Sequence, residues 1–341
     1  MSTRDDDRDL ASVARARMNG KVKPLGSLGR LEPLAIQLAR HLGTLTPHLD
    51  GCHLLLFAGD HGLAVEPGIS AYPSTVTRLM LQTFLEGRAA ANVLARSVGA
   101  SVFVVDAGVA GEAIESPGLI SRRIAPGTAN SLRGPAMTSS ECAEAIDTGA
   151  ALAREHAAPV LCCGEMGIGN TSAAALVAHK ITGVELAHLA GPGTGLDAAG
   201  VARKRALLIE AAARTASALP AAQAMAEYGG FELAMMAGAM RGGVEAGSVV
   251  IVDGFIATAS ACCALSLAPH IADGLVFAHR SAEPGHRHLL AHLDVQPLLA
   301  LDMRLGEGTG ALLAWPLVRS AAALISEMAS LEDIGVTAPP T

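Results

Sequence analysis

The feature that most constrains the fold is a pattern that occurs five times along the chain, in which a short aliphatic run ends abruptly in a polar cluster. The runs are HLLLF, SVFVV, PVLCC, SVVIV and LVFAH, at residues 53–57, 101–105, 159–163, 248–252 and 275–279. Continuous apolar runs of this length are typical of strands buried on both faces of a sheet. We therefore predict five buried strands, each followed by a polar loop.

Long stretches rich in alanine and leucine separate these runs. In the stretch from Ser74 to Arg96, for example, Val76, Met80 and Phe84 recur every four residues, and Ser74 is suited to cap the N-terminus of a helix. Strands that alternate with helices predict a parallel sheet covered by helices on both faces, which is an α/β fold.

The polar clusters follow the strands directly and include AGDHG after residue 57 and GEMGIGN after residue 163. In open α/β sheets ligands bind beyond the carboxyl ends of the strands, where helix N-termini also point. We expect the clusters to converge on one site. The alternative for each single cluster is a tight turn without further function.

Composition excludes several classes of protein. The 341 residues include 25 basic and 32 acidic side chains, giving a net charge of −7, whereas proteins that bind nucleic acid concentrate Lys and Arg. The longest uncharged stretch, Gly254–Pro269, is shorter than the roughly 20 residues that span a membrane. The charged opening MSTRDDDRDL has no signal-peptide pattern, and the six cysteines have neither disulfide nor zinc spacing. We expect a cytoplasmic protein without nucleic-acid or membrane partners.

Three glycine-rich segments lack a strong strand before them: PLGSLGRLE (24–32), GPGTGLD (191–197) and LGEGTGA (305–311). The last two share Gly-Thr-Gly, where backbone N–H groups can approach an anion without a Cβ in the way and the Thr hydroxyl adds a donor. Such a turn suits a single phosphate, although a simple loop is the alternative. The chain has neither a P-loop nor a G-x-G-x-x-G after its first strand, which argues against a dinucleotide-binding fold.

Eight segments in this order carry a resemblance to a known family: KPLGSLGRLE, FAGDHGLAVEPGISAYPSTVT, GEMGIGNTSAAAL, GPGTGLDAAGVARK, GGFELAMMAGAM, DGFIATA, AHRSAEPGH and MRLGEGTGA. They closely resemble nicotinate-nucleotide:dimethylbenzimidazole phosphoribosyltransferases over residues 21–336. The resemblance implies transfer of ribose phosphate from nicotinate mononucleotide to a benzimidazole, giving α-ribazole phosphate for the cobalamin lower ligand. It also implies a homodimer with a Rossmann-like parallel sheet in residues 46–310 and a smaller helical part built from residues 1–45 and 311–341.

Two carboxylates are the candidate catalytic groups. Glu307 stands between two glycines, where it can reach a planar substrate and accept the benzimidazole proton, and it matches the proton acceptor of the family. The alternative is a Glu that stabilises the N-terminus of the helix that follows. Glu165 could stabilise positive charge on the ribose, or it could brace its loop.

The candidate ligands for the nucleotide are mostly backbone groups. Gly167 and Gly169 would present N–H groups to it, while Asn170 or Thr171 would cap the next helix. For the phosphate we expect the turn of Gly193, Thr194 and Gly195 together with Lys204, which matches the family's phosphate ligand better than Arg203 does.

The benzimidazole needs a flat apolar slot with a polar edge. We expect Tyr72, Met80 and Gln82 to supply it, with the alternative that Met80 faces the core beside Val76 and Phe84. His61 and His279 could line the cleft or brace their loops.

No metal or other cofactor is expected. His286, His288 and His292 lie close together but have no acidic or Cys partner at a ligand spacing, and the cationic pyridinium leaving group needs no metal to neutralise it. Two rival functions remain open: a nucleotide sensor without catalysis, and a nucleosidase in which water replaces the benzimidazole.

Overall fold

The computed structural model describes residues 3–193 and 195–336, and within them six strands form one parallel sheet. The strand order is β3-β2-β1-β4-β5-β6, which is the order of doubly wound dinucleotide-binding folds. This order occurs here without the glycine fingerprint after the first strand. The strands are β1 (Cys52–Gly59), β2 (Ser101–Gly108), β3 (Leu119–Ser121), β4 (Val160–Met166), β5 (Val249–Val252) and β6 (Leu275–Phe277).

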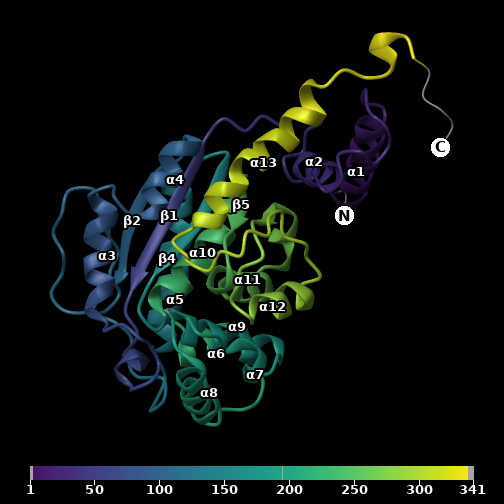
Figure 1. Ribbon diagram of the computed structural model, residues 1–341. Helices are drawn as coiled ribbons and strands as arrows, with labels where there is room; N and C mark the ends of the chain where they lie inside the picture. The colour runs from purple at the N-terminus through teal and green to yellow at the C-terminus, as the bar shows by residue number, and fades with distance from the viewer. Residues whose placement is uncertain (1–2, 194, 337–341) are drawn as a thin grey trace.

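Helices cover both faces of the sheet (Figure 1). One face carries α5 (Ser139–Glu155), α6 (Asn170–Thr182), α7 (Leu186–Leu189), α8 (Ala198–Ala212), α9 (Ala221–Tyr228), α10 (Phe231–Glu245), α11 (Phe255–Leu267) and α12 (His286–His292). The other carries α1 (Thr3–Asn19), α2 (Leu31–His41), α3 (Thr75–Leu85), α4 (Ala90–Val98) and α13 (Thr309–Glu327). Short 3₁₀ turns are η1 (Gly62–Val65), η2 (Pro269–Gly274) and η3 (Glu332–Ile334).

The five predicted strands are confirmed, because their side chains alternate between two apolar cores. In β1, Leu55 and Phe57 belong to one buried cluster and Leu54 and Leu56 to the other. The strand that the sequence analysis missed is β3, a three-residue edge strand that pairs only with β2. All six cysteines are buried and free, as small hydrophobic side chains should be.

The helix expected from Ser74 to Arg96 is two helices, α3 and α4, separated at Gly87, which has φ +71°. The Ser74 side chain makes no capping hydrogen bond. The buried face of α3 consists of Thr77, Leu81 and Phe84. The periodicity of four was therefore a correct sign of a helix and placed Phe84 correctly in the core, but Val76 and Met80 line a cavity instead.

Helices α1 and α2, near the start of the chain, lie beside the second half of α13 (Figure 1). Arg17 donates from Nε to the carbonyl of Ile325 at 3.0 Å, and Lys21 donates to the carbonyl of Met328. The first half of α13 nevertheless covers the sheet, since Ala311 and Trp315 are buried with β1 residues. The division into residues 46–310 and a second part stays a prediction.

Helix α13 is long and apolar enough to cross a membrane by length and composition alone. Its apolar surface is used inside the protein, where it packs against α2, α4 and the strands β4 and β5. The sequence analysis overlooked this helix when it considered only uncharged stretches.

The closest helix packing is between α5 and α10, behind the sheet. A Cβ on Gly149 would overlap the Met235 carbonyl, and one on Gly238 would overlap the Ile146 carbonyl. The two backbones can approach this closely only because these positions are glycine. This contact holds α10 against the sheet, and α10 begins at the edge where the polar loops gather.

We expect Gly238→Ala to lower the free energy of unfolding by about 1–3 kcal/mol, because overpacking a tight contact forces the helices apart. A lower thermal-melting midpoint would show it. Gly134→Ala is the control, since a Cβ there meets nothing within 4 Å. Equal midpoints for the two variants would mean that α5 and α10 separate without cost.

Candidate active site

A cavity of about 440 Å³ lies at the carboxyl edge of the sheet. Its lining comes from segments that follow β4, β5 and β6, from one side of α3, and from the loop that precedes α13. Both candidate catalytic residues, Glu165 and Glu307, line it. The polar clusters after four of the five predicted strands lie at this edge, either in the cavity lining or directly beneath it.

Glu307 is held in an unusual backbone conformation. Gly306, Glu307 and Gly308 all have positive φ, at +88°, +61° and +75°, a region that a Glu rarely adopts. The carboxylate is only 5% exposed and accepts the N–H of Ala91 at 3.3 Å, in the first turn of α4. Glu307 is thus bonded to the N-terminus of a neighbouring helix, not of its own. Burial raises the pKa of Glu307, and the Ala91 N–H partly opposes this.

Asp253 fixes the loop that carries Glu307. It follows β5, is 3% exposed, and accepts the N–H of Ala311 at 2.9 Å as well as those of Gly308 and Gly310. These are N–H groups that the start of α13 leaves without intrahelical partners. Burial raises the pKa of Asp253 to about 7, although these N–H groups stabilise the ionised carboxylate and so oppose the rise. The sequence marked Asp253 as a strand end but gave no sign of this contact.

Glu165 ends β4 beside β1, and its register partner is Phe57. Its carboxylate accepts from the side-chain amide of Asn170 and packs against Gly306. Burial, followed by the charges of Asp253 and Glu232, raises the pKa of Glu165 well above its ordinary range. The expected cap of α6 is wrong, because Gly169 occupies that position and the Asn170 side chain turns back to Glu165.

Under the cavity, His61 and Glu232 form a buried ion pair with 2.6 Å between Nε2 and Oε1. Their side chains are 2% and 0% exposed. Burial opposes the charged ring, but the charge and hydrogen bond of Glu232, with a smaller effect of Asp60, outweigh it and raise the pKa of His61. Sequence reasoning missed Glu232, which stands 171 residues from its partner. His61 therefore braces its loop and is not a free side chain of the cleft.

Of the four predicted phosphate ligands, Gly193 and Lys204 lie close together at the cavity. Lys204 is 1% exposed and donates to Thr171 Oγ1 at 3.0 Å, and both Thr171 and Gly193 line the cavity. Burial lowers the pKa of Lys204 to about 8, and Glu283 opposes this. Arg203, the alternative, is exposed. Gly195 is outside the cavity lining, and Thr194 lies outside the described residues.

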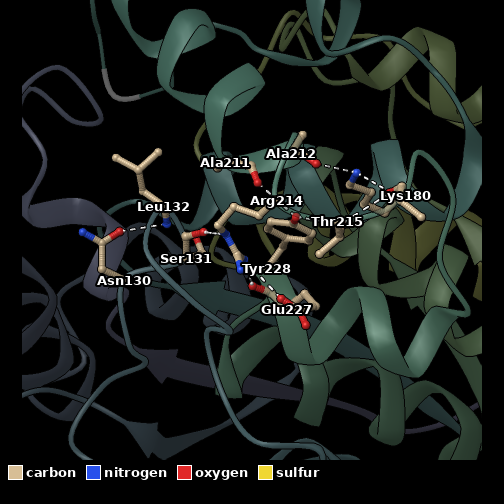
Figure 2. A network of polar contacts seen from close by, with 11 residues as sticks. Asn130, Ser131, Leu132, Lys180, Ala211, Ala212, Arg214, Thr215, Glu227 and Tyr228 are labelled. Atoms are coloured by element: carbon tan, nitrogen blue, oxygen red, sulfur yellow. Dashed lines mark hydrogen bonds and ion pairs between the residues drawn. The ribbon is translucent and has the colours of Figure 1, made fainter.

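The far ends of α6 and α8 are tied together, which fixes Lys204 relative to Thr171. Figure 2 shows Lys180 of α6 pointing at the end of α8, where it donates to the carbonyls of Ala212 and Ala216 at 2.8 and 2.7 Å. Tyr228 donates to the Ala211 carbonyl at 3.0 Å, and Arg214 to that of Ser131 at 2.8 Å (Figure 2). The Ala211 and Ala212 carbonyls belong to the last turn of α8, so the bonds from Tyr228 and Lys180 hold the end of that helix in place.

The remaining candidates are divided between the cavity and its surroundings. Gly167, Tyr72 and Met80 line the cavity, with Met80 half-buried beside Val76. Gly169 packs instead against η1, where a Cβ would lie 3.1 Å from Ala64. The prediction for Gln82 is wrong, because its exposed side chain donates to Glu86 at 3.1 Å, away from the cavity.

The histidines of the 286–292 segment have structural partners. His286 accepts from the Ser281 N–H and bonds to Thr258, each at 2.9 Å, and burial lowers its pKa to about 3. His288 stacks on His188 with ring centroids 4.5 Å apart. Among residues 3–193 and 195–336, no three His, Cys, Asp or Glu side chains are grouped to hold a metal ion.

We expect Glu232→Gln to destabilise the protein most at acidic pH. Since Glu232 raises the pKa of His61, the pair contributes fully below the ordinary value of 6.5 and loses its contribution as pH rises through the higher folded pKa. Removing one partner of a buried pair costs about 3–5 kcal/mol. Urea unfolding should show a larger deficit at pH 6 than at pH 9. A deficit independent of pH would mean that the folded protein holds His61 neutral.

Comparison with known proteins shows the family to which the chain belongs. A family model described as phosphoribosyltransferase matches residues 4–336. The nicotinate-nucleotide–dimethylbenzimidazole phosphoribosyltransferase of Variovorax paradoxus is 49% identical over 331 residues, covering 97% of this chain and 95% of that protein. The protein of the same name from Pseudomonas putida is 50% identical over 339 residues, covering 98% and 96%. The crystal structure of CobT from Thermus thermophilus has a TM-score of 0.93 at 43% identity, covering 97% of this chain and 100% of that one. The chain therefore belongs to the nicotinate-nucleotide:dimethylbenzimidazole phosphoribosyltransferase family.

Proposed function

We propose that this protein transfers the phosphoribosyl group of nicotinate mononucleotide to dimethylbenzimidazole, releasing nicotinate and forming α-ribazole phosphate. The observation that carries the proposal is that one cavity is lined both by Glu307, on its rigid glycine turn, and by Thr171 and Gly193, which Lys204 contacts from behind. A carboxylate base and an anion-binding group are the two parts that the reaction needs.

In the proposed reaction the bond between the ribose C1′ and the pyridinium nitrogen breaks, and its electron pair stays on that nitrogen, so the ring becomes a neutral pyridine and nicotinate departs as its carboxylate anion. A benzimidazole nitrogen forms the new bond to C1′, while the proton on the other nitrogen passes to Glu307. Burial supports this role, because the raised pKa makes the ionised carboxylate a stronger base. A cationic ribose favours the ionised forms of Glu165 and Asp253, and their charge stabilises it in turn.

The acceptor base would lie against Tyr72, Val76 and Met80, which present apolar surface to the cavity. The chain acts on these small molecules as a homodimer in the cytoplasm, without nucleic-acid or membrane partners. The family resemblance supports the homodimer, and the net charge of −7 argues against nucleic acid.

Chromatography of the products from nicotinate mononucleotide and a panel of bases tests the function. Release of nicotinate only when a benzimidazole is present, with formation of a new ribotide, supports it. Release without any acceptor would identify a nucleosidase, and binding without release would identify a sensor.

We expect Glu307→Gln to fold and bind both substrates but to turn over about 10²–10⁴ times more slowly, because general-base catalysis contributes about that much. Gln preserves size and hydrogen bonding but accepts no proton. A benzimidazole methylated on one nitrogen, which carries no N–H, should lose much less rate. Near-normal turnover would transfer the role of base to Glu165.

We expect Lys204→Ala to weaken binding of nicotinate mononucleotide about tenfold to a hundredfold, since a charge-assisted contact contributes about 1.5–3 kcal/mol. Affinity for free benzimidazole should be unchanged. Wild-type affinity for the nucleotide should also fall as pH rises through about 8, where Lys204 loses its charge. Arg203→Ala on the same helix is the control, and an equal loss in that variant would count against a specific role for Lys204.

A further inference from the structure

A fourth buried carboxylate in the cavity, Glu283, has no part in the reaction as proposed. It follows β6, is 6% exposed, and lines the cavity together with Thr171 and Gly193. A carboxylate at this place is unexpected, because the substrate group proposed to bind here is itself an anion. Sequence analysis did not single it out within the segment AHRSAEPGH.

Glu283 is bonded to the loop that forms the predicted phosphate turn. The Gly193 N–H donates to its carboxylate. A Cβ on Gly191 would overlap Glu283 Oε2, and one on Gly193 would lie 3.4 Å from Lys204 Nζ. The loop at residues 191–193 therefore lies directly between the Glu283 carboxylate and the Lys204 ammonium.

Two positive groups act on Glu283 from different elements, Lys204 from α8 and Arg304 from the loop before α13. Arg304 also donates to the Gly193 carbonyl at 3.2 Å. Two cations and backbone N–H groups beside one part of the cavity are groups that can bind a phosphomonoester. The Glu283 carboxylate acts on both cations through space, while Lys204 itself donates to Thr171 and Arg304 to Gly193. Its negative charge offsets theirs in the free protein.

We propose that Glu283 stands in for the substrate phosphate in the free protein, and that its carboxylate takes up a proton from solvent when the phosphate of the nucleotide reaches Lys204 and Arg304. This inference rests on the proposed function, because it uses the nucleotide as ligand. The reason is repulsion: a phosphate and a buried carboxylate that lie near the same two cations cannot both keep their full charge at low cost. Protonation removes the carboxylate charge without moving the loop.

The neighbouring groups support assigning the proton to Glu283. Burial raises the pKa of Glu283, while Lys204, Arg304 and the Gly193 N–H hold it down, so engaging the cations with phosphate raises it further. On α12, His286 donates its backbone N–H to the Glu283 carbonyl, but its ring is neutral at assay pH because its pKa is about 3. Lys204 is mostly charged at pH 7, since its pKa is about 8. The carboxyls of Glu165, Asp253 and Glu307 also line the cavity, so a variant is needed to isolate Glu283.

Titration calorimetry at pH 7 tests the proposal, with nicotinate mononucleotide and separately inorganic phosphate as ligands. Buffers of different ionisation enthalpy report the number of protons taken up on binding. We expect net proton uptake by the wild type, less uptake by Glu283→Gln by up to one proton, and binding by that variant at least as tight as by the wild type. Glu245→Gln, an exposed position at the far end of α10, is the charge-matched control and should behave as the wild type.

Two results would overturn the proposal. One is the same proton uptake in wild type and Glu283→Gln. The other is tenfold weaker nucleotide binding by Glu283→Gln with an unchanged melting midpoint, which would make Glu283 a direct ligand or a loop brace. If Glu283→Gln does not fold, a wild type that takes up no proton when the nucleotide binds is enough to refute the proposal. If the wild type forms α-ribazole phosphate normally but takes up the same number of protons as Glu283→Gln, only this inference is refuted. If the wild type takes up the proton but forms no product, only the proposed function is refuted.

Discussion

The contact between Asp253 and the start of α13 is the interaction on which the site depends. A buried carboxylate at the end of β5 accepts N–H groups from the first turn of a helix that also joins the two ends of the chain. This contact satisfies N–H groups that would otherwise be buried without partners, and it places the sheet edge and the Glu307 turn in one rigid unit. The positive φ of Glu307 is tolerated because the residues on both sides of it are fixed.

The cavity concentrates negative charge. Burial raises the pKa values of Glu165, Asp253 and Glu307, and Glu165 is affected by both of the others. Such crowding opposes folding, because each ionised carboxylate is desolvated near another. A cationic ribose arriving between them would relieve that repulsion, so the same crowding favours a transition state with oxocarbenium character. Below the cavity, His61 balances the charge of Glu232, so that the floor adds little further repulsion.

The sheet could be predicted because its signal is local. Each aliphatic run is long enough to be buried on both faces, and all five runs form strands. The edge strand β3 has only three residues and no such run. The stretch from Ser74 to Arg96 misled because apolar residues continue at helical spacing across Gly87, although the chain turns there. A spacing of four also drifts around a helix of 3.6 residues per turn, so it assigned Val76 to the core, whereas Val76 lines the cavity.

Glu307 and Glu165 could be predicted from the residues alone because glycine flanks each of them. Glu232 and Glu283 were missed because their partners are distant in sequence, and nothing near either residue in the chain indicates an ion pair or a phosphate turn. One signal was nevertheless present. Gly59, Gly167 and Gly230 come from three separate segments that meet at the pair of His61 and Glu232. A Cβ on Gly59 or Gly230 would overlap the Glu232 carboxylate, and one on Gly167 would overlap the Gly59 carbonyl. Of the three, none has a φ that only glycine adopts, so turn geometry does not explain them. These glycines are explained by the close approach of three loops around one buried ion pair. Glycines of this kind therefore indicate a buried polar centre even where the sequence does not show which residues form it.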